Sequence, residues 1–203
     1  MKSNMEYRYL KNLKDKKANK FTDPLSIQKK KPKFSDKAKF RAWCADEKTD
    51  HVFYSTVEGD NPSLRIQSDN PPNAISGIVA DYDAPVDWDI VERIIQTQCK
   101  GLLPTWISKT QSGYMRLVWE FKKIPISPDM FAAFMQRMCT HLRLDRIFAG
   151  FDRSSLKSNQ YFELGEDWKK IGDPLEDSVV QTMLLKAAMD KPPQTTETSI
   201  PME

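Results

Sequence analysis

Two aspartates close an apolar run and carry the chemistry of a metal site. The segment GIVADYDAPVDW, residues 77 to 88, places Asp81 and Asp83 directly after small and apolar residues. Side chains alternate along a strand, so both carboxylates are expected on the same face. Adjacent like charges raise a carboxyl pKa and cost stability, and Mg²⁺ or Mn²⁺ would remove that cost. The alternative is a strand that has ended in two solvated turn acids.

A turn between two strand-like segments offers groups that suit a triphosphate. The turn reads Lys109-Thr-Gln-Ser-Gly, and its glycine is typical of a hairpin. Ser112 and Gly113 supply a hydroxyl and backbone N–H groups, with Lys109 and Arg116 as cations on either side. A surface hairpin with ordinary polar residues explains this segment equally well.

A third acid, Asp152, follows Gly150 and Phe151. The residues before it could hold it against a sheet, beside the first two acids. Alternatively, Asp152 caps a turn through the serines that follow it, as aspartate commonly does. The sequence leaves both interpretations open.

The elements that must position these residues can be read from periodicity and turn signals. The order of strands, helix, hairpin, helix and strand predicts an α+β layer, with an antiparallel or mixed sheet and helices on one face. Ser127-Pro128-Asp129 is an N-cap signal for the second helix. The expected strands are 51–56, 63–67, 75–83, 105–108, 114–121 and 160–164, and the expected helices are 86–100, one from 128 onward and 179–188.

Positive charge is concentrated at the N-terminal end of the 203-residue sequence. The net charge is +3, but the first 40 residues hold thirteen Lys or Arg against four Asp or Glu, a local charge of +9 that leaves −6 for the rest. We expect a basic flexible leader over 1–39, a catalytic domain over 40–175, a helical segment over 176–190 and a disordered tail over 191–203. The leader is either a solvated tail or an arm that lies along phosphates.

Several classes of protein are disfavoured. Three widely spaced cysteines and two histidines argue against a zinc knuckle and a disulfide framework. The first residues do not have the pattern of a signal peptide, and no apolar stretch reaches the length of a membrane span. A soluble, cytoplasmic protein with no membrane partner is expected.

The order of the motifs resembles that of the archaeo-eukaryotic primase superfamily, and most of all the primase-polymerase domains of phages and plasmids. The resemblance covers roughly residues 40 to 170. Its residues are Asp81 and Asp83, the turn Ser112-Gly113 with Arg116, and Asp152 followed by Asn159 and Phe162-Glu-Leu. It implies a modified RRM-like sheet with flanking helices, joined to a second small α/β lobe.

The resemblance also implies roles for these residues. Asp81, Asp83 and Asp152 would be catalytic and would bind Mg²⁺ or Mn²⁺ for two-metal nucleotidyl transfer. The groups expected to hold the nucleotide are Lys109, Ser112, Gly113 and Arg116. Arg116 stands where the family has a histidine, and it keeps a cationic phosphate donor there with a longer reach.

Nucleic-acid contacts and partners follow in the same way. The cations expected to contact nucleic acid are Arg65, Arg153 and Lys157. The implied function is a DNA primase and DNA-directed polymerase in replication of a phage or plasmid, acting in the host cytoplasm. Its partners would be a single-stranded DNA template, nucleoside triphosphates and a replicative helicase.

Two other functions compete with this one. A non-catalytic replication initiator that binds single-stranded nucleic acid would use the same RRM-like sheet and basic arm. A metal-dependent nuclease is the other, although a carboxylate-x-Lys arrangement is hard to find after Asp81. A nickase built on a histidine pair is disfavoured because His51 and His141 are isolated.

Overall fold

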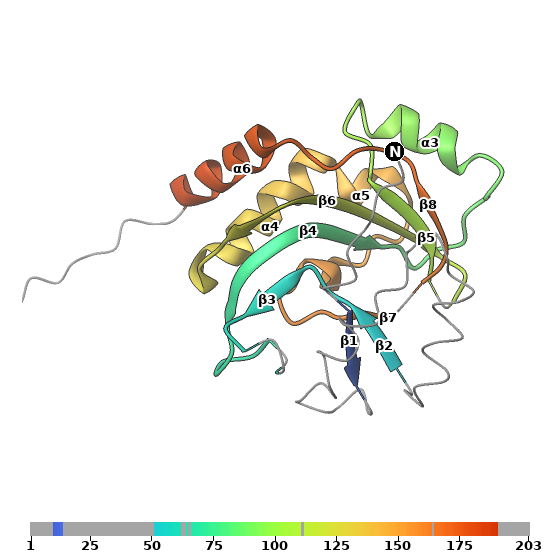
Figure 1. Cartoon of the computed structure of the whole chain (residues 1–203). Coiled ribbons are helices and arrows are strands. Elements are labelled where there is room, and N and C mark those ends of the chain that lie inside the picture. Colours follow the sequence, from blue (N-terminus) through green and yellow to red (C-terminus); the bar gives the residue numbers. More distant parts are fainter. Residues whose placement is uncertain are drawn as a thin grey trace, which may run out of the picture.

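A five-stranded antiparallel sheet carries the fold (Figure 1). The computed structural model describes residues 10–13, 51–61, 64, 66–110, 112–163 and 165–190. Every strand pair of this sheet is antiparallel, which confirms the antiparallel α+β part of the predicted fold. In spatial order the strands are β3 (Val57–Gly59), β4 (Pro72–Asp81), β6 (Met115–Pro125), β5 (Trp106–Lys109) and β8 (Glu166–Lys170).

The two central strands, β4 and β6, have apolar residues on both faces because both faces are covered. On one face, Ile78 lies opposite Trp119 and both belong to the main hydrophobic core. On the other face, Val79 lies opposite Val118, and both are buried outside that core. Alternation along β4 therefore places Asp81 on the Val79 face, away from the core.

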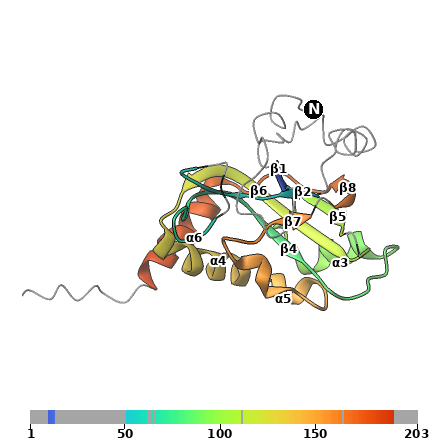
Figure 2. The same cartoon turned by 90° about the horizontal axis from the view of Figure 1, so that it is seen from below.

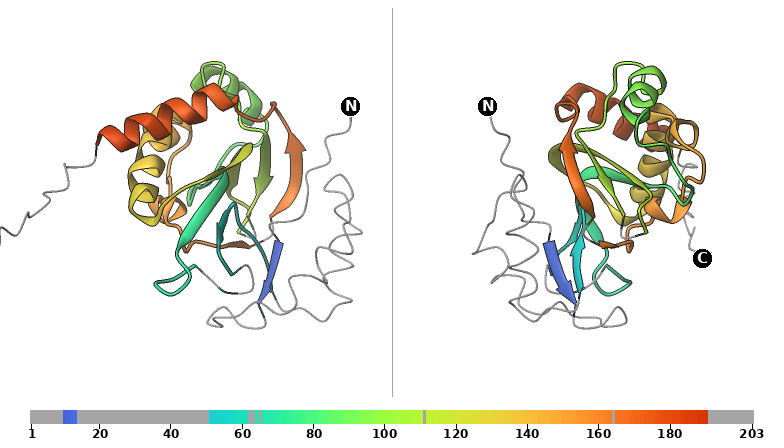
Figure 3. Two further views of the ribbon diagram at one scale, coloured as in Figure 1. Left: turned by 60° about the vertical axis from the view of Figure 1, so that its left-hand side comes forward. Right: turned by 90° about the vertical axis from the view of Figure 1, so that its right-hand side faces the viewer.

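Among the described residues, four α-helices cover the core face, and a smaller sheet lies on the opposite side (Figures 1 and 3). The helices are α3 (Val91–Gln98), α4 (Pro128–Leu142), α5 (Leu144–Ile147) and α6 (Asp177–Met189). The second and longest of them, α4, begins after Ser127 with a proline in its first turn, as predicted. Its apolar stripe is buried against β4, and α6 packs on it.

The first helix is shorter than its periodicity predicts. The apolar spacing extends from residue 86, but α3 begins at Val91. The backbone N–H of Asp89 donates to the Asp87 carboxylate, 3.0 Å away. This local bond supports a turn in place of the first helical turn. At the other end, Lys100 and Gly101 adopt positive φ values, which stop the helix where the glycine predicts.

The smaller sheet is antiparallel and lies across the helix-free side of the larger one (Figure 2). Its spatial order is β1 (Leu10–Leu13), β2 (His51–Tyr54) and β7 (Phe162–Glu163). β1 falls within the stretch expected to be a flexible leader, and the rest of 1–39 lies outside the described residues. The tail over 191–203 also lies outside them, so the domain boundaries remain predictions.

Three details differ from the sequence expectation or extend it. The strand expected over 51–56 supplies β2, and β3 follows it in the larger sheet. Within the strand expected over 63–67, Gln67 instead pairs with Asn70 in a tight turn. β8 was not anticipated. The second α/β lobe and the RRM-like detail remain predictions. Within the described part of the chain, no helix has the length and apolar character needed to cross a membrane.

Candidate functional site

Backbone pairing brings the three predicted acids to one place. β4 ends at Asp81, whose carbonyl oxygen accepts a hydrogen bond from the N–H of Asp152 at 2.9 Å. The N–H of Asp83 donates to the carbonyl of Gly150 at 2.7 Å. Residues 150–152 thus run antiparallel to residues 81–83. We call Asp81, Asp83 and Asp152 the acid cluster.

Gly150 is required for this pairing. It adopts φ +75°, a conformation that residues with a side chain rarely take. A Cβ atom at this position would lie 2.9 Å from the Cβ and the backbone N of Ala84 and 3.0 Å from the carbonyl carbon of Asp83. Only glycine therefore allows the chain to pass this close to the residues that follow β4.

The middle of the pairing is anchored in the core. Tyr82 forms an isolated antiparallel bridge with Phe151, and their rings are 5.7 Å apart. The hydroxyl of Tyr82 donates to the carbonyl of Leu144 at 2.7 Å, and Tyr82 is fully buried. The aromatic residue between the two aspartates thus fixes their backbone against the helix layer.

The acids act on one another electrostatically. Asp83 is exposed, and its pKa is raised from the usual aspartate value by partial desolvation and by the negative charges of Asp152 and Asp81. This is the electrostatic penalty expected for carboxylates placed close together. A cation bound between them would relieve it.

Asp81 already has a cationic partner. Arg116 lies directly opposite it on β6 and forms a two-pronged ion pair, with Nε 2.7 Å from Oδ1 and Nη2 2.9 Å from Oδ2. The Arg116 side chain is 3% exposed and that of Asp81 17%. The guanidinium also lies over the Phe162 ring, 5.4 Å from its centre. Arg116 thus holds Asp81, and the predicted contact of Arg116 with a triphosphate stays a prediction.

Asp152 is also engaged by protein groups. It caps the short 3₁₀ helix η2 (Arg153–Leu156), accepting hydrogen bonds from the N–H of Ser154 at 2.9 Å and from its hydroxyl at 2.5 Å. The next residue, Ser155, accepts a hydrogen bond from the Asp81 N–H at 3.2 Å. The capping interpretation of Asp152 is therefore correct, and it coexists with the convergence of the acids.

The side chains of the acid cluster are of the type that binds divalent cations, but they are not close enough together to share an ion in this structure. Carboxylate oxygens are the ligands that Mg²⁺ and Mn²⁺ prefer. Among the described residues, however, no three His, Cys, Asp or Glu side chains are grouped closely enough to hold an ion. Each carboxylate has about four acceptor positions, so the bonds from Arg116 and Ser154 do not exhaust Asp81 and Asp152. Cation binding would require these two side chains to turn toward Asp83.

The hairpin between β5 and β6 lies at the same end of the sheet. The N–H of Tyr82 donates to the carbonyl of Met115, the first residue of β6 after the turn. Gly113 adopts φ +83°, and its N–H donates to Thr110 within the turn at 2.9 Å. That N–H is therefore used locally, whereas Ser112 is exposed. The turn lies next to the acid cluster, and its predicted contact with phosphates is untested.

The predicted cations lie in different surroundings. Lys109 is 3.3 Å from the Asp167 carboxylate and its ammonium lies over the Trp88 ring, 4.7 Å from the centre. Arg153 turns toward the helix layer and donates to the Gln136 side chain at 2.9 Å. Lys157 is exposed, and Arg65 lies outside the described residues.

Sequence reasoning missed the side chains that hold the acids in place. The capping of Asp152 by its neighbours was one of the two open interpretations, but the hydrogen bond from the Asp81 N–H to Ser155 was not anticipated. Ser108 was not singled out. It lies opposite Arg116 on β5, is fully buried, and its hydroxyl has no hydrogen-bond partner among the described residues.

Comparison with known proteins gives one distant structural likeness. No family model and no curated protein matches the sequence. Among solved structures, the chain is similar to the AEP domain of the primase-polymerase of cyanophage S-2L, with 15% identity and a TM-score of 0.45 over 70% of this chain and 76% of that one.

Proposed function

We propose that this chain is a metal-dependent nucleotidyltransferase of the primase-polymerase type. The observation that carries the proposal is the convergence of Asp81, Asp83 and Asp152, fixed by the backbone pairing of 81–83 with 150–152. The sequence resemblance described above supplies the same three acids in the same order. The reaction would be template-dependent addition of a nucleotide to a primer 3′-hydroxyl.

The chain's own residues would divide the work. Asp83, the exposed member of the acid cluster, would recruit Mg²⁺ or Mn²⁺, and Asp152 and Asp81 would complete the ligand set. When bound, the ion would supply Lewis-acid stabilisation of the phosphate charge. Arg116 would hold the Asp81 carboxylate in place through its two hydrogen bonds.

The hairpin would receive the triphosphate. Ser112 is exposed at the turn, and Lys109 ends β5 at the same end of the sheet as the acids, although its side chain shares the core face with Met115 and would have to reach around the strand end. A serine hydroxyl and an ammonium group both donate to phosphate oxygens. Lys109 would exchange its partly exposed ion pair with Asp167 for the phosphate, which costs little because exposed pairs are weak.

Nucleotide incorporation on a primed single-stranded template, with Mg²⁺ or Mn²⁺, tests the proposal. Asp83→Asn keeps the shape of the side chain and removes its charge, and we expect at least about a hundredfold loss of incorporation. Asp89→Asn is the matched control because Asp89 is also an exposed aspartate in the segment after β4. We expect it to retain full activity. Failure of the folded chain to incorporate nucleotide with either metal would rule the polymerase out.

One observation favours a second candidate, a non-catalytic protein that binds single-stranded nucleic acid. Two of the three acids are engaged by Arg116 and Ser154, and the described residues hold no ready group of three metal ligands. Such a protein would bind a single-stranded oligonucleotide equally well with a chelator present and would incorporate no nucleotide. The same assay, run beside a binding titration in the chelator, separates the two candidates.

A further inference from the structure

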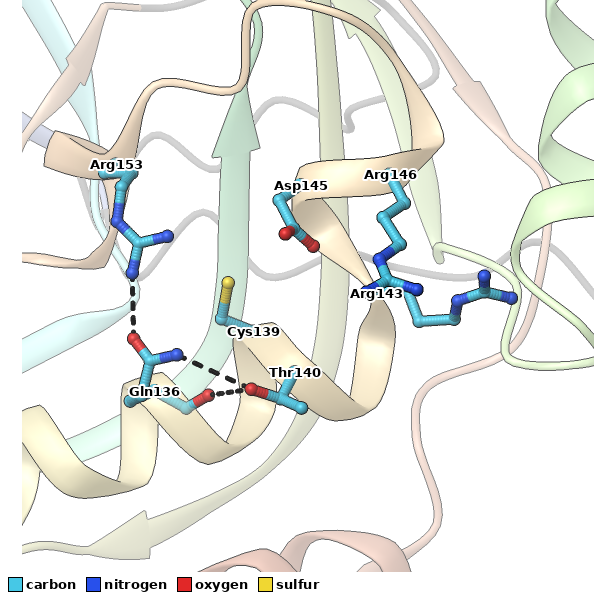
Figure 4. A pocket seen from close by; sticks show the side chains of 7 residues that line it. All are labelled: Gln136, Cys139, Thr140, Arg143, Asp145, Arg146 and Arg153. Atoms are coloured by element: carbon cyan, nitrogen blue, oxygen red, sulfur yellow. Dashed lines mark hydrogen bonds between the residues drawn. The ribbon is translucent and has the colours of Figure 1, made fainter.

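A second charged site lies on the helix side of the molecule, at the junction of α4, α5 and η2 (Figure 4). A cavity of about 400 Å³ opens there. Pockets for small ligands commonly have volumes of a few hundred Å³. We call it the arginine pocket, and its lining residues are Gln136, Cys139, Thr140, Arg143, Asp145, Arg146 and Arg153.

The pocket gathers positive charge from three elements. Arg143 ends α4, Arg146 lies on α5 and Arg153 opens η2, whereas Asp145 is the one carboxylate of the lining. In the described part of the chain, neither Arg143 nor Arg146 has a carboxylate within ion-pair distance. The lining therefore has a surplus of positive charge that the described residues do not neutralise.

The guanidinium groups of the lining lie on both sides of Asp145 (Figure 4). In Figure 4, Arg153 and Asp145 flank Cys139, with Gln136 bonded to Arg153. Burial raises the pKa of the Cys139 thiol, and the charges of Arg153 and Asp145 both act on it from outside. Arg143 and Arg146 extend beyond Asp145 on the other side (Figure 4).

A helix end explains only part of this charge. A cation at the C-terminus of α4 interacts favourably with the helix dipole, which accounts for Arg143. It does not account for Arg153, which comes from a separate segment after the helix pair. Arg143 and Arg146, which lie beyond Asp145 as seen from Arg153 (Figure 4), suit a phosphate, because each guanidinium presents a planar set of donors that matches phosphate oxygens.

The other lining groups indicate what accompanies the phosphate. Asp145 is an acceptor, and Gln136 and Thr140 can accept or donate. A carboxylate repels a bare anion but accepts hydrogen bonds from hydroxyl or amino groups. A nucleotide carries both kinds of group, a phosphate for the arginines and sugar or base donors for Asp145. We propose that the arginine pocket binds one nucleotide unit through its phosphate.

This site is separate from the acid cluster. None of its lining residues is a member of that cluster, and α4 and α5 lie on the core face, opposite the face that carries Asp81. The pocket adjoins the cluster along the chain, because Arg153 follows Asp152. Nucleotide binding here requires neither a metal ion nor catalysis, so its test is independent of the proposed polymerase.

Binding of a fluorescent single-stranded oligothymidylate to the full chain, in the presence of a chelator, tests the proposal. Arg143→Gln/Arg146→Gln should weaken binding roughly tenfold. It should also flatten the dependence of log affinity on log salt by roughly 0.7 per lost phosphate contact. The matched control is Arg93→Gln/Lys100→Gln, which removes two exposed cations outside the pocket, one of them also at positive φ like Arg143. The control should bind as the unmodified chain does.

Competition by dTTP and by inorganic phosphate identifies the source of the phosphate. Displacement of the oligonucleotide by dTTP, lost in Arg143→Gln/Arg146→Gln, supports a pocket that accepts free nucleotide. Resistance to dTTP, with the variant still weakened, supports a pocket that takes a nucleotide within a strand. Inorganic phosphate competing as well as dTTP would overturn the assignment to a nucleotide. Equal affinities and salt slopes for the pocket variant and the unmodified chain would overturn the site itself.

Discussion

The acid cluster and the arginine pocket differ in how their charges are balanced. In the acid cluster, Arg116 neutralises Asp81 and Ser154 caps Asp152, so only Asp83 faces solvent without a bonded partner among the described residues. In the arginine pocket, two of the three guanidinium groups have no carboxylate within reach in the described chain. Two of the three acids are thus bonded within the fold, whereas two of the three pocket arginines have no carboxylate partner among the described residues.

Because of this difference, substitutions in the two regions can distinguish effects on folding from effects on ligand binding. Removing a charge that is buried and paired leaves its partner uncompensated, which is costly. Removing a charge that is exposed and unpaired costs the fold almost nothing, so any loss of binding reports on the ligand. Substitutions of the paired charges at the acid cluster should therefore mainly lower stability. Substitutions in the arginine pocket should mainly weaken binding.

The largest loss of stability is expected from Arg116→Ala. Asp81 would then be left largely buried without its cation, and breaking a buried pair in this way costs about 3 kcal/mol. Urea unfolding measures the loss. Arg137→Ala is the control, because Arg137 makes a similar two-pronged pair with Asp190, but both side chains are about 40% exposed. We expect a much smaller loss of unfolding free energy there, because exposed ion pairs are weak. Equal losses in the two variants would mean that burial of the Asp81 pair has no special role.

Gly150→Ala is expected to lower the free energy of unfolding by about 2 kcal/mol, less than Arg116→Ala does. The added Cβ would contact Ala84 at 2.9 Å and would sit at positive φ. Gly101→Ala is a control that measures the cost of positive φ alone, because Gly101 also has positive φ but has open space around it. We expect about 1 kcal/mol for that control by urea unfolding. If the two glycines cost the same, the close approach of 150–152 to 81–83 is not needed for stability.

The sequence predicts the parts of this fold that depend on local pattern. Ser127-Pro128 and the spacing of Phe131, Phe134 and Met138 locate α4 because capping and amphipathicity are properties of neighbouring residues. Alternation along 77–83 correctly separates the core face from the face of the acids. The convergence of Asp152 with Asp81 was anticipated from the order of motifs, and the backbone pairing agrees with it.

What the sequence does not predict depends on register and on long-range pairing. Arg116 meets Asp81 only because β4 and β6 pair in one register, and a shift of one residue would place the guanidinium on the other face. The arginine pocket requires a sharp change of direction at Arg143, which has φ +57° without being glycine. No local signal marks a turn of that kind at an arginine, so its meeting with Arg153 could not be foreseen.

A small gain in stability is expected from Asp83→Asn. The folded pKa of Asp83 lies above its unfolded value, so the folded chain holds a proton more tightly than the unfolded chain does. The protonated Asp83 carboxyl therefore contributes its full stabilisation below the unfolded pKa, and this stabilisation is lost as the pH rises through the folded pKa. At neutral pH the charge therefore opposes folding, and its removal should stabilise the chain by at most about 0.5 kcal/mol, because the site is exposed. The measurement is the difference in urea midpoint between the asparagine variant and the unmodified chain, taken near pH 4 and near pH 7. A difference that is no larger at pH 7 than at pH 4 would contradict the prediction.

The smallest effect on stability is expected in the arginine pocket. Arg143→Gln/Arg146→Gln should change the free energy of unfolding by no more than about 0.5 kcal/mol, because neither guanidinium has a carboxylate partner in the described chain. Urea unfolding with and without saturating oligothymidylate sharpens the contrast with Arg116. A bound ligand raises the midpoint of any chain that binds it, so the oligothymidylate should stabilise Arg93→Gln/Lys100→Gln more than the pocket variant. A large intrinsic loss in the pocket variant would instead mean that these arginines hold α4 and α5 together, and the contrast between built-in and unneutralised charge would fail.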